Sequence, residues 1–229
     1  MHFLLPIAFA VILGLASYLM SANQTKRTLA KQSKPLANPA LETRFMMLAN
    51  ALDLKRLEVN VYDIDPVNGL AAPDGQIYIT RGFLEKFSSG EVTAAEMSSV
   101  IAHELGHVAL GHTKRRMIDF SGQNAIRTAL SVTLNRFIPL IGPWIANMVI
   151  NMVAARMSRK DEFEADAYAT ALMIKAGLGA APQKSLFVKL NKLTGSAGAA
   201  PAWFLSHPKT TDRIKAIETN EKRWTGTVS

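Results

Sequence analysis

Three histidines and one glutamate lie close together in the segment Val100–His112, which reads VIAHELGHVALGH. His103 and His107 are four residues apart, so on a helix their imidazoles stand one turn apart on the same face and can bind one ion. Glu104 is turned by about 100° from His103 on such a helix, so it can lie beside the ion without binding it. Zinc lowers the pKa of a water that it binds to about 7, and a neighbouring carboxylate can accept the proton. The spacing therefore predicts a hydrolytic zinc site with Glu104 as its general base.

The alternative is a surface helix whose histidines are solvated. Against this alternative, apolar side chains surround the motif: Val100, Ile101, Ala102, Leu105, Val108 and Leu110. Burial of two imidazoles and a carboxylate among such residues would be costly unless those groups had partners. The surroundings of the motif therefore favour a metal site.

A catalytic zinc site of this kind needs a third protein ligand. The pattern HExxHxxGxxH does not supply it, because the glycine position holds Leu110 and the third histidine position holds Thr113. His112 is one place out of that pattern, so it points to a different side of the helix end. We expect His112 to cap the helix or to interact with its dipole rather than to bind the metal.

A carboxylate on a second helix is the other source of a third ligand. In SRKDEFEADAYATALMIKAG, Glu162 and Asp166 are four residues apart and share a helix face. Glu162 can complete a His-His-Glu zinc site, and Asp166 can accept a hydrogen bond from the outer ring nitrogen of a zinc-bound histidine, which we expect to be His103. The alternative is that these acids only complement the helix dipole, as we expect of Asp161. Glu164 lies off the shared face, and we expect it to be solvated.

Two residues near the C-terminus are further candidates for the site. His207 precedes Pro208 in a predicted loop. Three roles stay open for it: stabilising the oxyanion of the tetrahedral intermediate, occupying the open metal position to hold the enzyme inactive, or packing beside Trp203 and Phe204. Arg213 either supports the same site or pairs with an acidic residue.

The elements that must position these residues are mostly helices with a small sheet, so the predicted fold class is α+β. Apolar periodicity predicts helices at about 41–54, 83–87, 93–110, 124–136, 159–176, 182–193 and 211–223. Alternating patterns predict strands at 57–65 and 76–82, with a turn region at 67–75 between them. Thr93 and Glu96 form a capping box that opens the HExxH helix, and Gly111 is expected to end it.

The N-terminal residues 3–20, FLLPIAFAVILGLASYLM, carry no charge. As a helix they rise about 27 Å, close to a hydrocarbon core of roughly 30 Å. Because nothing basic precedes them except the amino terminus, we expect a retained transmembrane signal anchor at 1–22, with a cleaved signal peptide as the alternative. Residues 23–40 are predicted to be a juxtamembrane linker. Its basic residues are Lys26, Arg27, Lys31 and Lys34, which are expected in the cytoplasm or on anionic headgroups.

A second uncharged segment, Phe137–Ala155, lies between the two halves of the predicted site. Pro139, Gly142 and Pro143 interrupt it, and the roughly 12 helical residues that remain before Arg156 are too few to span a membrane. We expect a lid or a core helix near the zinc, with a second transmembrane span as the alternative.

Composition narrows the function classes. Apolar residues make up 48% of the 229 residues and charged residues 19%, which excludes wholesale disorder. The absence of cysteine excludes disulfides and thiolate metal ligands. A net charge of +8 fits attraction to an acidic surface, either anionic lipid or nucleic acid, with simple solubility as the alternative. We expect no nucleic-acid partner, because no basic face interleaved with aromatic residues and no reading motif is present.

Four segments occur together in this order: NGLAAPDGQIYITRG, VIAHELGHVALGH, SRKDEFEADAYA and SHPKTTDRI. In this combination the chain resembles the HtpX-like and CAAX-prenyl-protease family of membrane-associated zinc metallopeptidases, which includes the Oma-type quality-control proteases. The resemblance implies a zincin-like (gluzincin) domain, expected over 41–229, that holds one Zn²⁺ per chain. It also implies that His103, His107 and Glu162 are the zinc ligands and that Glu104 is the general base.

The resemblance also implies a membrane-anchored metalloendopeptidase for unfolded or damaged membrane and envelope proteins. In zinc peptidases of this plan an edge strand lies above the active-site helix, and Ile77–Thr80 is expected to take that place. Ile77, Tyr78 and Ile79 would then accept an unfolded peptide as a further strand, unless the protein itself covers them. A slow or latent membrane chaperone or adaptor is the alternative function. We expect the protein at a bacterial inner membrane or cell envelope, with the membrane side and the oligomeric state left open.

Overall fold

The computed structural model describes residues 4–72, 74–116, 131, 138, 141–193 and 211–226. The predicted helix at 124–136 lies almost wholly outside these residues, and so does His207. In chain order the elements are α1 (Leu4–Lys31), β1 (Ser33–Pro35), α2 (Pro39–Ala51), β2 (Val59–Tyr62), β3 (Gly69–Ala71), β4 (Ile77–Thr80), α3 (Arg81–Ser88), α4 (Ala94–Ala109), α6 (Gly142–Lys175), α7 (Ala181–Leu193) and α9 (Thr211–Thr225). The predicted mostly helical α+β class is confirmed.

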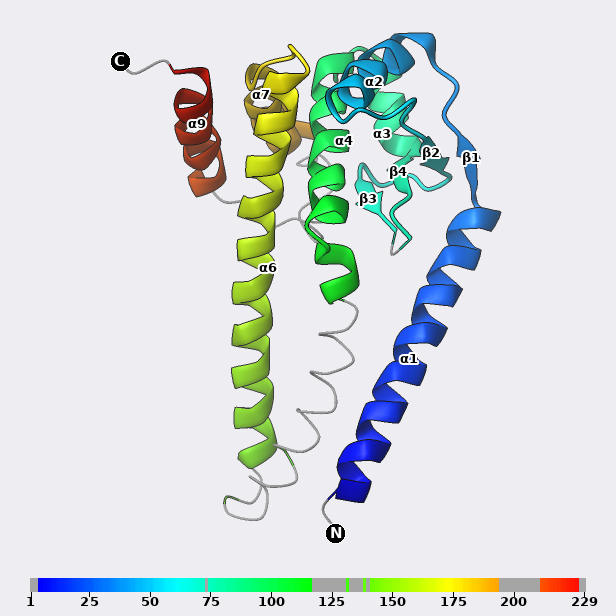
Figure 1. The fold of residues 1–229 in the computed structure, drawn as a ribbon, viewed down its shortest axis with the longest axis vertical. Coiled ribbons are helices and arrows are strands. Elements are labelled where there is room, and N and C mark those ends of the chain that lie inside the picture. The colour runs from blue at the N-terminus through cyan, green and yellow to red at the C-terminus, as the bar shows by residue number, and fades with distance from the viewer. Residues whose placement is uncertain are drawn as a thin grey trace.

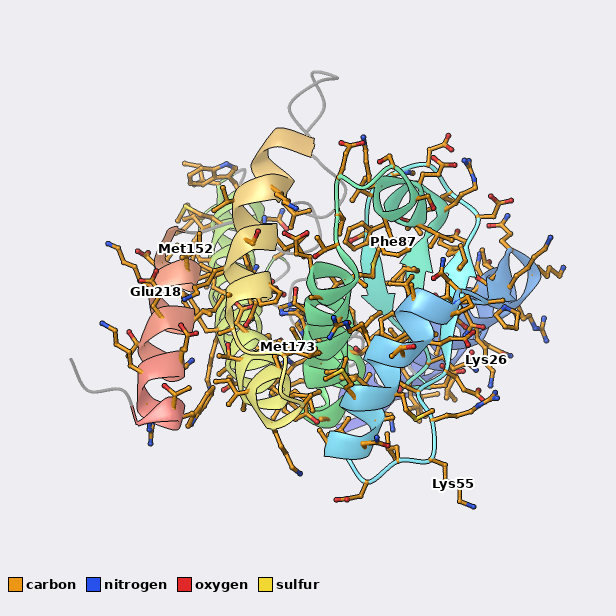
Figure 2. The ribbon with its side chains drawn as sticks, turned by 90° about the horizontal axis from the view of Figure 1, so that it is seen from above. Lys26, Lys55, Phe87, Met152, Met173 and Glu218 are labelled. Atoms are coloured by element: carbon orange, nitrogen blue, oxygen red, sulfur yellow. The ribbon has the colours of Figure 1, made fainter. Side chains whose placement is uncertain are left out.

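The helix α4 lies between the sheet on one side and α6 on the other, and α9 packs on α6 (Figure 1). One apolar cluster joins the sheet, α4 and α6, and a separate cluster that includes Phe187 and Ile217 lies between α7 and α9. The first cluster includes Leu41, Phe45, Leu48, Val59, Ile77, Ile79, Phe83, Met97, Val100, Ile101, Ala169, Leu172, Met173, Leu186 and Leu190. Met173 lies near the middle of the molecule in the view from above, whereas Lys55 and Glu218 lie at its periphery (Figure 2). The core therefore fixes α4 against both the sheet and the acidic segment of α6.

The sheet has the strand order β1-β2-β4-β3, with β2 and β4 parallel and the outer strands antiparallel to their neighbours. The prediction that Ile77–Thr80 is the edge strand is therefore wrong. These four residues form β4, which lies inside the sheet and is buried throughout. The edge next to α4 is instead β3, which the sequence predicts only as part of a turn region. Its three residues are too short to show alternation, and the pairing with β4 makes them a strand.

The N-terminal helix does not stop where the predicted anchor ends. It continues through Lys31, and the next residues form β1, which pairs with β2. Leu29 is buried against Tyr78 of β4, so the end of this helix is packed on the sheet. The predicted juxtamembrane linker, residues 23–40, thus includes the end of α1, the strand β1 and the start of α2. Within the described residues, no helix is long and apolar enough to cross a membrane.

The helix α6 is continuous over 34 residues and includes most of the segment that was predicted to be a lid or core helix. The described part is not a core helix, because Trp144 is 64% exposed and Met152 is 66% exposed, whereas a lid stays a prediction. Pro143 does not break the helix because it lies in its first turn, where the missing N–H has no intrahelical partner. The first half of α6 extends beyond the body of the protein, on the same side as the N-terminal half of α1 (Figure 1).

Candidate metal centre

The helix α4 carries the HExxH residues and is fixed at both ends by its own sequence. The predicted capping box is confirmed: the Glu96 N–H donates to Thr93 Oγ1 at 3.2 Å, and the Thr93 N–H donates to Glu96 Oε2 at 2.8 Å. At the other end Gly111 has a φ of +69°, which favours glycine and turns the chain away from the helix. His103 and His107 are both buried on the face that α6 covers.

Gly106, between the two histidines, allows α6 to approach α4 closely. A Cβ atom at this position would lie 3.0 Å from the carbonyl oxygen and 3.1 Å from the Cα of Ala165. Ala165 stands between Glu162 and Asp166 on α6, so this contact brings both carboxylates to the histidines. All four side chains are buried.

The side chains of His103, His107 and Glu162 converge on one point. His103 Nε2 lies 3.1 Å from His107 Nε2 and 3.3 Å from Glu162 Oε2, and His107 Nε2 lies 3.4 Å from Glu162 Oε1. Ligand bonds of about 2.0 to 2.1 Å in a tetrahedral site place neighbouring donor atoms about 3.3 Å apart. Two imidazoles and one carboxylate at these separations fit a catalytic zinc site with one open position.

Asp166 and Arg213 support this cluster from behind. His103 Nδ1 lies 2.9 Å from Asp166 Oδ1. The Arg213 Nε–H donates to Asp166 Oδ2 at 2.6 Å and its Nη2–H donates to Oδ1 at 2.8 Å, while Nη1 lies 3.3 Å from Glu162 Oε2. The Arg213 side chain is fully buried and stacks on the Phe187 ring. Arg213 therefore pairs with an acidic residue, Asp166, and by this contact it also supports the site.

These contacts set the charges of the buried groups. For Asp166, burial raises the pKa, but hydrogen bonds from Arg213 and His103 outweigh burial and hold the pKa below its usual value. For His103, burial lowers the pKa, but Asp166 and Glu162 outweigh burial and raise the pKa to about 9. Burial lowers the pKa of His107 to about 4. Asp166 is thus an ionised acceptor, and His107 is a neutral imidazole with a lone pair for a metal. His103 is protonated in the metal-free protein, and a metal that binds at its Nε2 would displace the proton from that nitrogen.

Glu104 is buried on α4 beside His103. Its charge lies close enough to raise the pKa of both His107 and Arg213, although burial is the larger influence on each. Glu104 therefore lies at the cluster, as a general base would.

Three neighbours of the cluster make contacts that their predicted roles did not include. His112, expected to cap the helix or to interact with its dipole, is fully buried, and its Nδ1 lies 3.0 Å from Nδ1 of His107. Glu164 is not simply solvated, because its Oε2 lies 3.0 Å from His112 Nε2. Asp161 does not complement the start of a helix, because α6 begins at Gly142 and places it mid-helix.

Two interactions were not foreseen from sequence. Arg116 donates to Asp161 at 3.2 Å and to Glu162 Oε1 at 2.8 Å, so it is a second arginine that contacts the candidate ligand Glu162.

The inward position of the His112 side chain could have been predicted from the sequence, because Gly111 directly precedes it. A residue with positive φ at a helix end reverses the chain and returns the next side chain to the last turn.

A mostly helical α+β fold that brings two histidines of an HExxH helix to a glutamate of a second helix defines the class of HExxH metallopeptidases. Residues 35–221 match the family described as Peptidase family M48, and the chain belongs to this family of metalloproteases. The resemblance noted from the four sequence segments is thereby confirmed.

Individual relatives agree with this assignment. The chain is 33% identical over 185 residues to the metalloprotease LoiP of Escherichia coli K12, a match that covers 79% of the chain and 71% of the relative. It is 29% identical over 197 residues to the metalloprotease YcaL of the same organism, covering 86% and 73%. It is 23% identical over 168 residues to the human mitochondrial metalloendopeptidase OMA1, covering 70% of the chain but 31% of that protein.

Proposed function

We propose that this M48 metalloprotease is a zincin-like (gluzincin) endopeptidase that uses one Zn²⁺ to hydrolyse unfolded or damaged polypeptides at a membrane surface. The observation that carries the proposal is the buried cluster of His103, His107 and Glu162, whose donor atoms lie 3.1–3.4 Å apart. When bound there, zinc supplies a Lewis acid that polarises the scissile carbonyl and acidifies water.

The chain's own residues would divide the remaining work. Glu104 accepts the proton from the attacking water and delivers it to the leaving amine. Asp166 holds the ring of His103 through Nδ1, which leaves Nε2 for the metal. Arg213 contacts both Asp166 and Glu162. It therefore keeps Glu162, a candidate ligand, in a fixed position relative to Asp166, which orients His103.

The edge strand β3 supports an extended, sequence-tolerant substrate. The Ala72 N–H donates to Gln76 O, and the Thr80 N–H donates to Asn68 O. Because inward and outward backbone groups alternate in an antiparallel pair, the N–H and C=O of Gly69 and Ala71 face away from β4. A peptide that adds to β3 would bond to these groups through its backbone and would lie beside α4. Such binding favours unfolded chains over a particular sequence.

Exposed apolar side chains on two helices support a position at a lipid surface. On α1 they are Ile12, Leu15, Leu19 and Met20, and on the first half of α6 they are Trp144, Met148, Val149 and Met152. Both helix ends extend to the same side of the molecule (Figure 1). The basic residues of α1 and the segment after it would contact anionic headgroups.

Binding to phosphatidylglycerol vesicles tests the membrane part of the proposal. Replacement of Trp144 and Met152 by asparagine should weaken co-sedimentation, because both side chains are more than half exposed at the end of α6. Val188 is exposed on α7, and its replacement by asparagine is the matched control. Equal loss in the control would contradict this placement.

Zinc analysis and cleavage of casein test the catalytic part. The wild type should hold about one zinc per chain and cleave casein, and Glu104→Gln should keep the metal but lose cleavage. Full activity in Glu104→Gln would refute the mechanism. Bound zinc without any cleavage would instead favour the latent chaperone or adaptor. Glu162→Gln should lose zinc, because it removes the charge of the third ligand.

A further inference from the structure

The outer ring nitrogen of His107 faces a buried histidine. His107 Nε2 belongs to the cluster with His103 and Glu162, so its Nδ1 points away from that cluster. Nδ1 lies 3.0 Å from Nδ1 of His112, and Nε2 of His112 lies 3.0 Å from Glu164 Oε2. The exposed fraction of the His112 side chain is zero, so no solvent replaces these partners.

We propose that His112 is a positioning residue for the metal site: it holds His107 in the metal-binding tautomer, and Glu164 fixes His112 in turn. The inference rests on the proposed zinc site but not on any particular substrate. It assigns a role to the third histidine of VIAHELGHVALGH, which contacts the outer ring nitrogen of His107 and does not belong to the group of His103, His107 and Glu162.

The hydrogen positions follow from the requirement that a metal-binding nitrogen carries a lone pair. His107 Nε2 then has no hydrogen, so His107 Nδ1–H is the donor to His112. Nδ1 of His112 must be the acceptor, which leaves its hydrogen on Nε2. His112 Nε2–H then donates to the carboxylate of Glu164, and each group in the chain is satisfied.

Each of the two candidate histidine ligands is thus connected by hydrogen bonds to a carboxylate of α6. His103 reaches Asp166 directly, whereas His107 reaches Glu164 through His112. Together with Glu162, these acids make α6 the source of one ligand and of both terminal acceptors. Such acceptors fix the orientation of the imidazole and raise its basicity.

A second metal site at this place is less well supported. His112, Asp161 and Glu164 do form a group with suitable donor atoms. However, Asp161 already accepts hydrogen bonds from Arg115 and Arg116. These two guanidinium groups compensate the charge that would attract a cation. The hydrogen-bonded chain through His112 explains the same contacts without an added ion.

Zinc affinity, measured by competition with a chelator, tests the proposal without any substrate. His112→Phe fills the space but has no acceptor, so it should weaken zinc binding on the order of 10- to 100-fold. His112→Asn offers an oxygen near the position of Nδ1 and should recover most of the affinity. Ser99→Ala is the control, because Ser99 is buried on the same helix and its hydroxyl donates to the carbonyl of Glu96, three residues earlier. Glu164→Ala should have a smaller effect, since water can reach this half-exposed side chain.

Proton NMR of the cobalt(II)-substituted protein detects the ring N–H of each histidine ligand. A change in packing without loss of the hydrogen bond would not alter these signals. The wild type should show a slowly exchanging ring N–H signal for each of the two histidine ligands. His112→Phe should lose the signal of His107 by rapid exchange, and His112→Asn should retain it.

The outcomes separate this proposal from the proposed function. Equal zinc affinity in wild type and His112→Phe overturns the role of His112 while the zinc site stands. Binding by His112→Asn that is as weak as that of His112→Phe indicates packing alone and also overturns it. A wild type that binds no zinc refutes the proposed function together with this inference.

Discussion

Enlargement of Gly106 tests whether the contact between α4 and α6 sets the geometry of the metal centre. In Gly106→Ala the new Cβ would lie 3.0 Å from the Ala165 carbonyl oxygen, against 3.4 Å at which ordinary contact begins, a shortfall of about 0.4 Å. Because the contact is with backbone, no side-chain rotation relieves it, and α6 must move. Glu162 lies three residues before Ala165 on the same helix and moves with it.

The expected effect on zinc binding follows from the size of this shift. Site geometry tolerates displacements of roughly 0.5 Å, so Gly106→Ala should weaken zinc binding severalfold, and Gly106→Val should weaken it further. Stability should change less. Alanine gains about 1 kcal/mol over glycine inside a helix, which offsets part of an overpacking cost of about 1–3 kcal/mol.

The assay compares zinc affinity, from chelator competition, with the free energy of unfolding of the metal-free protein in urea. Ala109→Val is the control, because it enlarges an exposed residue of the same helix. If Gly106→Val binds zinc as tightly as the wild type, the close approach at Gly106 does not position Glu162, and the reasoning fails.

Four further predictions concern the buried carboxylates of Asp166 and Glu96 and the residue His207, which lies outside the residues that the structure describes. Asp166→Asn leaves the buried Arg213 charge poorly compensated and should cost about 3–5 kcal/mol in urea unfolding. Glu96→Ala removes the capping box and the contact with Lys189, at a cost of about 2 kcal/mol. Burial raises the pKa of Glu96, but its hydrogen bonds, that from Lys189 foremost, outweigh burial and lower it. The ionised Glu96 carboxylate therefore adds to the free energy of unfolding above pH 4.5, and this contribution is lost as the pH falls below that value. Between neutral and acid pH, the free energy of unfolding of Glu96→Gln should therefore fall less than that of the wild type. His207→Ala should raise casein cleavage if His207 blocks the metal position and lower it if His207 stabilises the transition state; no change would leave it a packing residue.

Several features of the site could be predicted from the sequence because they depend on residues close together in the chain. The four-residue spacing of His103 and His107, the capping box at Thr93 and the stop at Gly111 are properties of one helix. Helical periodicity and i, i+4 spacing follow from backbone geometry, so they are visible without any partner. Likewise Glu162 and Asp166 share a face wherever their helix packs.

The predictions that failed depend on residues far apart in the chain. Strand order decides which strand is the edge, and it is set by hydrogen bonds between segments, so β4 could not be told from β3 by its pattern. The exposure of Trp144 depends on what covers α6, not on the apolar character of its segment. The acceptor for His112 lies on another helix, 52 residues further along the chain.

The sequence by itself determined the chemistry: which groups can bind a metal, which carboxylate can take a proton, and which helix presents them. Only the tertiary structure decided the partners. The approach of α6 to α4 at Gly106 brings Glu162 to the histidines, and the same helix supplies Glu164 to His112. Spacing along one helix is fixed by bond geometry, whereas the pairing of buried polar groups is fixed by which surfaces pack together and exclude water.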